Sequence, residues 1–302
     1  MARTQELLTR EDIADQIQIG KTRATTAWQN TLARRIPSST DRENIVIGGA
    51  VPTVQERNGI NRRDQSVDRL WTIHNVTYDA LHDMPREAYV DDQIGRVAEL
   101  ARLLGVRIAS HPARLISELV ADGEVGLCYD GLPFYSDNHT HAGEAVQSNL
   151  VSGSGVASAD DVATDLWAAI AGLYSVLDDK GEPIFEPEEA INFVLHYPPA
   201  LAQYLNEVVK AQVRGATSNV LIGLYNFSHW PDARLSGDDW YIHASAPDRR
   251  PFIFQEREAP SQIFIGPDDV DVKAGKRKVL FGETVRYAMA YADWRHSCKI
   301  DN

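Results

Sequence analysis

Cysteine is scarce in this chain of 302 residues, and the two that occur, Cys128 and Cys298, lack the paired spacing of zinc ligands. Two cysteines are also too few for a disulfide framework. We therefore expect two reduced thiols in a cytosolic environment. A nucleophilic Cys128 would need a nearby histidine to lower its pKa, and we favour a buried thiol instead.

Long apolar runs are missing as well. A membrane-spanning helix needs about 18 consecutive apolar residues, and no such stretch occurs here. The N-terminal sequence MARTQELLTREDIADQIQIG also lacks the apolar run of a secretory signal. We expect a protein that is made and kept in the cytoplasm and has no membrane partner.

Positive charge is in deficit. The chain has 30 Lys and Arg against 43 Asp and Glu, a formal net charge of −13. This balance argues against sequence-independent binding to phosphates and makes DNA binding a poor first hypothesis. The basic residues are concentrated near the N-terminus, where ten lie between Arg3 and Arg63 against seven acidic residues.

The N-terminal quarter of the chain is predicted to form exposed segments attached to a folded body. The first 45 residues have few large apolar side chains, apart from a short periodic set that includes Ile13 and Ile17 and predicts one modest amphipathic helix. Residues 46–64 mix β-rich sequence with Gly, Pro and an Asn-Gly pair, which predicts a long exposed β-hairpin loop. We expect the following strand to run back into the body and to end at Pro85.

Helical periodicity follows from Asp91. Apolar residues at steps of three and four predict the longest helix over 91–110, a break at Pro112 and a second apolar face up to Gly123. Ser158 stands at capping-box spacing from Asp161 and predicts the start of another helix. A fourth helix is expected after the Pro-Pro pair that begins at position 198.

The final third is rich in strands, with FIF at 252–254, IFI at 263–265 and an alternating segment over 285–292. We find no internal repeat, heptad array or low-complexity tract, which excludes solenoids and coiled coils. With 43% hydrophobic residues to form a core, the composition and pattern predict a soluble α+β protein.

The strongest candidate for chemistry is SDNHTHAGE, which places Asp137, His139, His141 and Glu144 within eight residues. Such a cluster would suit a zinc hydrolase. However, no HExxH helix or distant third ligand supports a metal here, and we favour a polar loop. No metal site, cofactor site or catalytic residue is therefore assigned.

Two further segments have an ordinary structural interpretation. The acidic run PDDVDV at 267–272 lacks the ligand spacing of a calcium loop and is typical of a solvated turn. Trp230 and Trp240 could form a sugar platform, but aromatic residues beside turns are more often core or subunit contacts. The segments VSGSGVAS and GVASADD match neither a phosphate-binding loop nor a nucleophile turn.

Three segments of the chain are distinctive: ASHPARLISELVADG with LCYDGLPFYSDNHTH (109–141), RRPFIFQEREAP (249–260) and VLFGETVRYAMAYADWRHSCK (279–299). They resemble the major head subunit of Mu-like bacteriophages. Their order also matches that family, and the likeness spans roughly residues 80–300. Residues before about 60 are similar only in general character.

The resemblance implies the Hong Kong 97-type capsid fold, an α+β plan with an N-terminal arm, an extended β-hairpin loop, a peripheral domain on a long spine helix, and an axial domain. The expected boundaries are 1–45 for the arm, 46–80 for the loop, 81–178 with 246–302 for the peripheral domain, 179–245 for the axial domain and 91–110 for the spine helix.

The function implied is that of a structural subunit that self-assembles into pentamers and hexamers of an icosahedral head around double-stranded DNA. The implied partners are other copies, a scaffolding protein, a portal and a decoration protein, with packaged DNA inside and not specifically bound. Such heads assemble in the host bacterial cytoplasm and become part of the virion. Some shells of this fold are cross-linked through a Lys on the loop, but residues 46–80 contain no Lys.

The candidate contact residues between subunits are Arg57, Arg62 and Arg63 on the loop, with Trp230 and Trp240 as anchors of the axial domain. Two alternatives remain open at this point. One is a metal-dependent hydrolase that uses Asp137, His139 and His141. The other is a nanocompartment shell that encloses an enzyme, which differs from a phage head in cargo rather than in fold.

Overall fold

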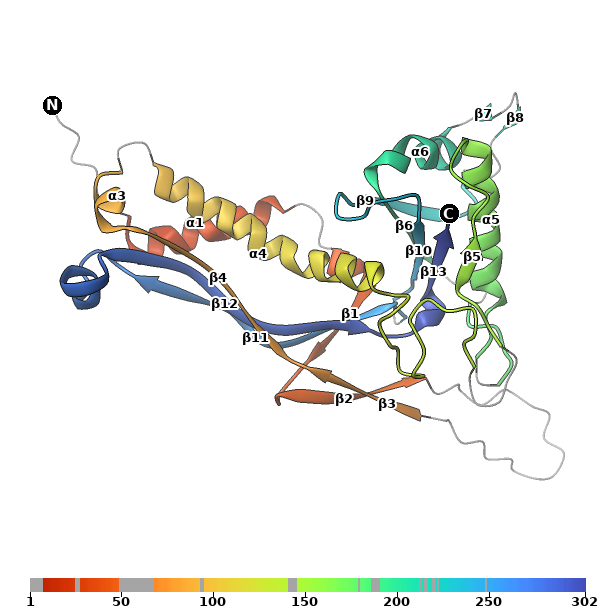
Figure 1. The fold of residues 1–302 in the computed structure, drawn as a ribbon, viewed down its shortest axis with the longest axis horizontal. Coiled ribbons are helices and arrows are strands. Elements are labelled where there is room, and N and C mark those ends of the chain that lie inside the picture. The colour runs from red at the N-terminus through yellow and green to blue at the C-terminus, as the bar shows by residue number, and fades with distance from the viewer. Residues whose placement is uncertain are drawn as a thin grey trace.

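The structure of the chain is a computed structural model, and it describes residues 8–24, 28–48, 68–92, 95–140, 146–178, 180–185, 191–211, 213–214, 217–218, 221, 223–247 and 249–302. An elongated part, made of a sheet and two helices, extends from a more compact unit that holds the C-terminus (Figure 1). A short two-stranded ribbon leaves the elongated part near their junction.

The elongated part is built on a four-stranded sheet in the order β1-β11-β12-β4. Its strands are β1 (Ala33–Pro37), β4 (Val76–Pro85), β11 (Phe252–Ile265) and β12 (Lys278–Tyr291). At about 3.3 Å per residue, the 14 residues of β11 or β12 span about 45 Å. The segments 252–254 and 263–265 are the two ends of β11, whose register against β12 shifts on either side of Glu258.

Two helices, α1 (Arg10–Arg23) and α4 (Arg96–Ala121), lie together along this sheet (Figure 1). The backbones of the two helices come into contact where Gly20 of α1 meets Gly105 of α4. A Cβ atom on Gly20 would lie 2.0 Å from the carbonyl oxygen of Arg102, and one on Gly105 would lie 2.1 Å from that of Ile17. Residues with a side chain would force the helices apart, so glycine at both positions sets their spacing.

The long helix differs from the predicted range of 91–110. Helix α4 begins at Arg96 and continues through Pro112 to Ala121, so the predicted break is wrong. Proline removes one hydrogen bond of the helix, but Pro112, Ala113 and Ile116 are all buried. Burial of this face against the core offsets the lost bond and keeps the helix continuous.

The compact unit contains a five-stranded sheet in the order β5-β13-β10-β6-β9. The strands are β5 (Leu150–Ser152), β6 (Asn192–Tyr197), β9 (Asn226–Pro231), β10 (Trp240–Ser245) and β13 (Ser297–Asp301). Helices α5 (Ala159–Ser175) and α6 (Ala202–Lys210) pack beside it and contact each other. Ser158 caps α5 by accepting a hydrogen bond from the Asp161 N–H, so the predicted helix start is confirmed.

This unit takes in more of the chain than the expected axial range of 179–245. Strand β13 pairs with β10 and β5, and helix α5 packs against both β5 and β13. These three elements lie in segments that were assigned to the peripheral domain. The C-terminal strand thus belongs to the same sheet as the central part of the chain.

Buried apolar side chains form two clusters. The large one lies under both sheets and α5 and includes Trp240, Trp294, Phe134 and Phe252. The small one lies at the far end of the elongated part, where the fully buried side chains of Ile13 and Ile17 on α1 pack with Phe281 and neighbouring residues. The predicted amphipathic helix around these isoleucines is therefore confirmed.

The remaining elements are short. The ribbon consists of β2 (Arg42–Gly48) and β3 (Asp68–His74), and the others are α2 (Trp28–Leu32), α3 (Arg86–Val90), η1 (Pro199–Leu201), β7 (Val213–Arg214), β8 (Thr217–Ser218), the π-helical turn η2 (Val272–Lys276) and η3 (Trp294–His296). None of the helices in the described ranges is long and apolar enough to cross a membrane.

Candidate functional site: the assembly surfaces

The β2–β3 ribbon carries apolar side chains on both of its faces. On the inner face, Ile45, Ile47 and Ile73 are buried against the body. On the outer face, Val46 and Leu70 stand directly opposite each other, and their exposed fractions are 48% and 69%. A two-stranded ribbon is marginally stable alone, and an exposed apolar pair on it favours a second contact surface.

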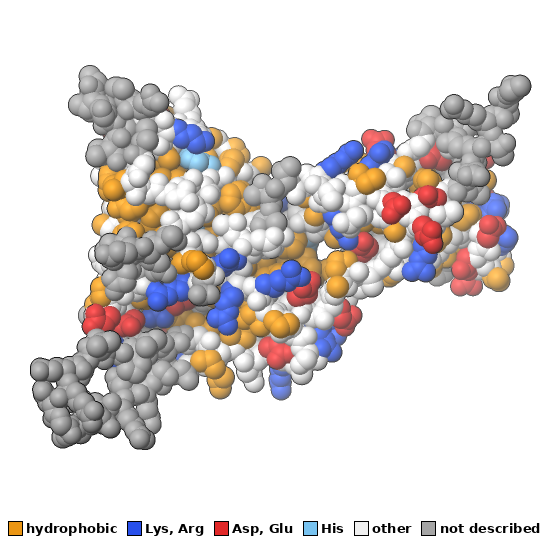
Figure 2. Space-filling model, turned by 180° about the vertical axis from the view of Figure 1, so that it is seen from behind, with side chains coloured by type: hydrophobic (Ala, Val, Ile, Leu, Met, Phe, Trp, Pro, Cys, Tyr) orange, Lys and Arg blue, Asp and Glu red, His pale blue; other side chains and the backbone are white. Residues whose placement is uncertain are grey.

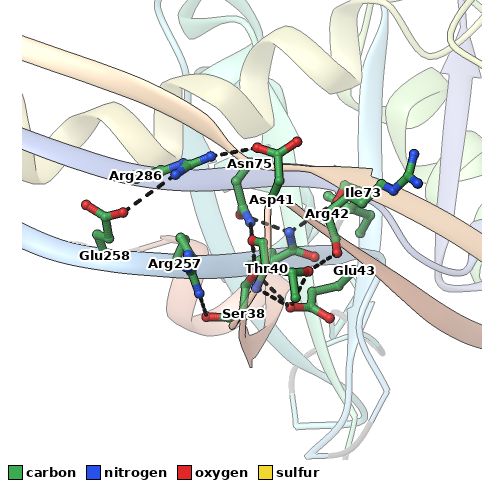
Figure 3. Close-up of polar contacts among 11 residues, drawn as sticks. Ser38, Thr40, Asp41, Arg42, Glu43, Ile73, Asn75, Arg257, Glu258 and Arg286 are labelled. Atoms are coloured by element: carbon green, nitrogen blue, oxygen red, sulfur yellow. Dashed lines mark hydrogen bonds and ion pairs between the residues drawn. The ribbon is translucent and has the colours of Figure 1, made fainter.

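The turn before the ribbon is held by a network of hydrogen bonds around Glu43 (Figure 3). The Glu43 carboxylate accepts hydrogen bonds from the N–H groups of Ser39 and Thr40, at 2.7 and 3.1 Å, and from the Ser38 hydroxyl at 3.0 Å. These bonds hold the pKa of Glu43 below its usual value. Glu43 therefore stays ionised and fixes the entry of β2.

The exit of the ribbon is fastened to the four-stranded sheet. Asn75, between β3 and β4, donates to Ser38 Oγ at 2.8 Å and accepts from Gln255 Nε2 at 2.9 Å. Arg286 of β12 pairs with Asp41 at 2.6 Å, as Figure 3 shows. Contacts at both ends therefore set the direction in which the ribbon leaves the body.

The described part of the arm is docked on its own protomer. Thr9 and Asp12 form a complete capping box at the start of α1. At its other end, Lys21 pairs with Glu283 of β12 at 2.6 Å, and both side chains are largely buried. The expectation of an exposed segment is therefore wrong for residues 10–23, because the Gly20–Gly105 approach buries α1 against α4.

The predicted contact residues fall into two groups. Arg57, Arg62 and Arg63 lie outside the described residues. Trp230 and Trp240 are buried, with exposed fractions of 5% and 0%. Neither indole lies on the protomer surface, so the interpretation of these two as contacts between subunits is wrong.

Trp230 has an internal structural role instead. Its ring stacks between Trp28, at a centroid distance of 5.0 Å, and His196, at 3.8 Å. It thereby connects α2 with the five-stranded sheet. The sequence alone could not tell whether these tryptophans occupy core or surface positions.

The histidine-rich loop does not form a ligand cluster in its described part. His139 is fully buried, its Nδ1 lies 2.7 Å from Asp130 Oδ2, and its ring stacks on Trp294 at 3.9 Å. Asp137 is exposed instead. His141 and Glu144 lie outside the described residues, and the residues that the structure does describe contain no group of three potential metal ligands.

Cys128 is a buried thiol, as predicted, with an exposed fraction of 1%. Burial raises the pKa of this thiol well above its usual value, so it is a poor nucleophile. Residues 268–271 of the acidic run are exposed and lead into η2, and Asp268 pairs with Lys273 at 3.0 Å, whereas Val272 is buried. Both interpretations from the sequence are confirmed.

A buried polar network joins α4 to the five-stranded sheet, and sequence reasoning missed it. Ser117 of α4 hydrogen-bonds the carboxylate of Asp232, whose Oδ2 lies 3.2 Å from His196 Nε2. His196 Nδ1 in turn lies 3.4 Å from His243 Nε2, and His243 Nδ1 lies 2.8 Å from Ser297 Oγ. These residues come from separate elements, so no local motif could have revealed them.

The network fixes protonation states as well as positions. Burial lowers the pKa of both His196 and His243, so both imidazoles are neutral near pH 7. Burial alone would raise the pKa of Asp232, but hydrogen bonds from His196 and Ser117 outweigh this and hold it below its usual range. The network therefore packs as a neutral pair of rings beside one carboxylate.

The elongated sheet with its long helix, the five-stranded end unit and the projecting ribbon together make up the Hong Kong 97-type capsid fold. The procapsid subunit of bacteriophage JBD30 superposes with a TM-score of 0.57 at 17% identity, covering 97% of this chain and 73% of that one. The mature capsid subunit of bacteriophage PhiM1 gives a TM-score of 0.59 at 10% identity, with coverage of 91% and 87%.

Sequence comparison gives the particular family. Residues 9–161, about half of the chain, match the family described as Mu-like prophage major head subunit gpT, and the chain belongs to this family of structural head proteins. The major capsid protein of Escherichia phage Mu is 30% identical over 110 residues. That alignment spans 36% of this chain and 36% of the phage Mu protein.

Proposed function

We propose that this chain is the building block of a phage head, a structural subunit whose copies close into pentamers and hexamers of an icosahedral shell around double-stranded DNA. It acts through its contact surfaces and uses no catalytic residue. The observation that carries the proposal is the family match over residues 9–161, which includes the arm helix, the ribbon and the whole of α4.

The ribbon supports this function. A closed shell needs each copy to contact neighbours through different surfaces, so that the contacts close into rings. The ribbon offers an apolar outer face at Val46 and Leu70, and its direction is fixed by the contacts around Glu43 and Arg286. A neighbouring copy that covers this pair would bury surface that the single protomer leaves in water.

We propose that the five-stranded unit is the axial domain and that the four-stranded sheet with α1 and α4 is the peripheral domain. On this assignment the axial domain takes in β5, α5 and β13 in addition to residues 179–245. The small buried cluster supports the division, because it lies wholly within the part built on the four-stranded sheet, α1 and α4, whereas the large cluster joins that part to the five-stranded unit.

The proposed partners are other copies of the chain, a scaffolding protein, a portal and a decoration protein. Packaged DNA would be enclosed without specific binding. The net charge of −13 opposes phosphate binding, and on the face in Figure 2 the described basic side chains are interspersed with acidic ones. The virion head is the place where this protein would function, after assembly in the bacterial cytoplasm.

Electron microscopy of the purified full-length chain tests the proposal. We expect closed polyhedral particles, alone or with the scaffolding protein expressed beside it. Analytical ultracentrifugation of the same sample gives the fraction assembled. A protein that stays a monomer or dimer under both conditions would contradict the proposed function.

A further inference from the structure

A groove of about 600 Å³ lies between the C-terminal half of α4 and the turn after β9. It is outside the ribbon and outside the arm contacts described above. Helix α4 lines one side with residues three, four and seven positions apart, and Arg234 lies across from them. The residues that matter for its chemistry are Arg107, Ser110, His111, Arg114, Glu118 and Arg234.

The groove concentrates positive charge on an acidic chain. Three arginines and one glutamate line it, while the whole chain carries −13. The Arg114 Nε atom pairs with Glu118 at 2.7 Å, and Arg234 pairs with Asp232 at 3.1 Å. Arg107 has neither an ion pair nor a side-chain hydrogen bond within the described part of the chain, so its guanidinium is free to take an anionic group.

The spacing on α4 is regular. Arg107 and Arg114 are seven residues apart and lie on one face, about 10.5 Å apart along the helix axis. His111 lies between them, and its Nδ1 is 2.6 Å from the Tyr287 hydroxyl. Burial lowers the pKa of His111, so near pH 7 it adds a hydrogen-bonding group and no charge. The wall thus offers two guanidiniums with a neutral imidazole between them.

We propose that this groove binds an acidic peptide segment of a second protein, whose carboxylates pair with Arg107 and Arg114. A guanidinium matches a carboxylate with two parallel hydrogen bonds. Ser117, which also lines the groove, is 2% exposed and hydrogen-bonds Asp232. Flexible glutamate or aspartate side chains can enter such a recess beside Glu118, whereas the phosphates of a duplex need an open basic surface.

A binding assay on the unassembled full-length protomer tests this directly. The probe is a dye-labelled oligoglutamate peptide, and the readout is fluorescence anisotropy at low and moderate salt. We expect saturable binding that weakens with salt, and an Arg107→Glu variant that binds at least about tenfold more weakly. Arg107→Lys keeps the positive charge but cannot form two parallel hydrogen bonds to one carboxylate. Its affinity for the peptide should therefore lie between those of the unchanged protein and the Arg107→Glu variant.

Arg96→Glu is the matched control, because Arg96 is an exposed arginine on the same helix outside the groove. It should bind the probe as the unchanged protein does, and thermal melting should show that all variants are folded. Equal loss in Arg96→Glu and Arg107→Glu would overturn the proposal in favour of general charge attraction.

Competition separates the possible ligands. A single-stranded oligonucleotide that displaces the peptide at equal charge concentration would overturn the proposal in favour of nucleic acid. Loss of the peptide site on assembled particles would overturn it in favour of a second copy of this chain. The anisotropy measurements on single protomers do not depend on whether the chain forms shells, so failure of peptide binding can be told apart from failure of the proposed function.

Discussion

At the scale of single residues, the structure places imidazole and carboxylate groups where they pack rather than react. His139, His196 and His243 are all fully buried. Each has a hydrogen-bonding partner, and two of the rings stack on tryptophans. Burial lowers the pKa of His196 and His243 and so favours their neutral forms, and this makes stability depend on pH.

We expect the free energy of unfolding of the protomer to fall as the pH drops below about 6.5. Unfolded histidine has a pKa near 6.5, whereas burial lowers the pKa of His296 to about 4 and also lowers those of His196 and His243. The unfolded chain therefore takes up protons first. The stabilisation is complete above pH 6.5 and is lost as the pH falls toward the folded values, by at most about 1.4 kcal/mol per pH unit for each histidine.

Chemical denaturation of the unassembled protomer at several pH values between about 7.5 and 5 measures this slope. His243→Gln should make it shallower. His74→Gln, at an exposed position on β3, should leave it unchanged. Identical slopes for the two variants would contradict the assignment to the buried network.

At the scale of elements, the packing of α1 on α4 concerns the folding of the single protomer, whereas the exposed face of the ribbon concerns the proposed contact with other copies. The approach of α1 to α4 at Gly20 and Gly105 stabilises the single protomer, because it fixes the described part of the arm on its own body. The ribbon leaves Val46 and Leu70 in solvent. Substitutions in these two places should therefore separate folding from assembly.

Gly105→Ala should destabilise the protomer by about 1–3 kcal/mol, because its Cβ would lie 2.1 Å from the Ile17 carbonyl oxygen and force the helices apart. Gly172→Ala is the matched control within α5, where a Cβ would meet nothing within 4 Å. At position 172 alanine has a higher helix propensity than glycine, so the free energy of unfolding should equal or slightly exceed that of the unchanged protein. Urea denaturation compares the two, and equal effects would contradict the close packing.

Leu70→Asp should abolish assembly and leave the protomer folded, because Leu70 is 69% exposed and its replacement removes no core contact. Leu70→Met keeps an apolar surface and is the control that should still assemble. Sedimentation gives the assembled fraction, and circular dichroism confirms the fold. Normal particles from Leu70→Asp would show that the outer face of the ribbon is not an interface.

At the scale of the whole molecule, the two units share an apolar core, and the ribbon projects from them with apolar side chains exposed to solvent. The large apolar cluster lies under both sheets, so the units are joined through a common core. On the proposed function, the exposed pair of Val46 and Leu70 on the ribbon is available for contact with a neighbouring copy.

We expect the mature shell to be held by non-covalent burial alone, because residues 46–80 contain no Lys that could form a cross-link from the extended loop. Particles boiled in detergent should then run as one band near 33.6 kDa on a denaturing gel. A ladder of multiples of this mass would contradict the prediction. Mass spectrometry of any such band would locate the bond.

Periodicity along the sequence was sufficient for the elements whose contacts are local. The capping of α5 at Ser158, the end of β4 at Pro85 and the burial of Ile13 and Ile17 were all predicted, because each depends on neighbours within a few residues. The buried Cys128 and the solvated acidic turn follow from local composition in the same way.

What only the tertiary structure decided involves residues far apart in the chain. The helix continues through Pro112 because its buried face packs on the core, and Trp230 lies inside because Trp28 and His196 stack on it. The groove beside Arg107 exists because the turn after β9 comes back to α4. Sequence patterns report which residues prefer burial, but the partners that bury them, and the surfaces left over, depend on how distant segments meet.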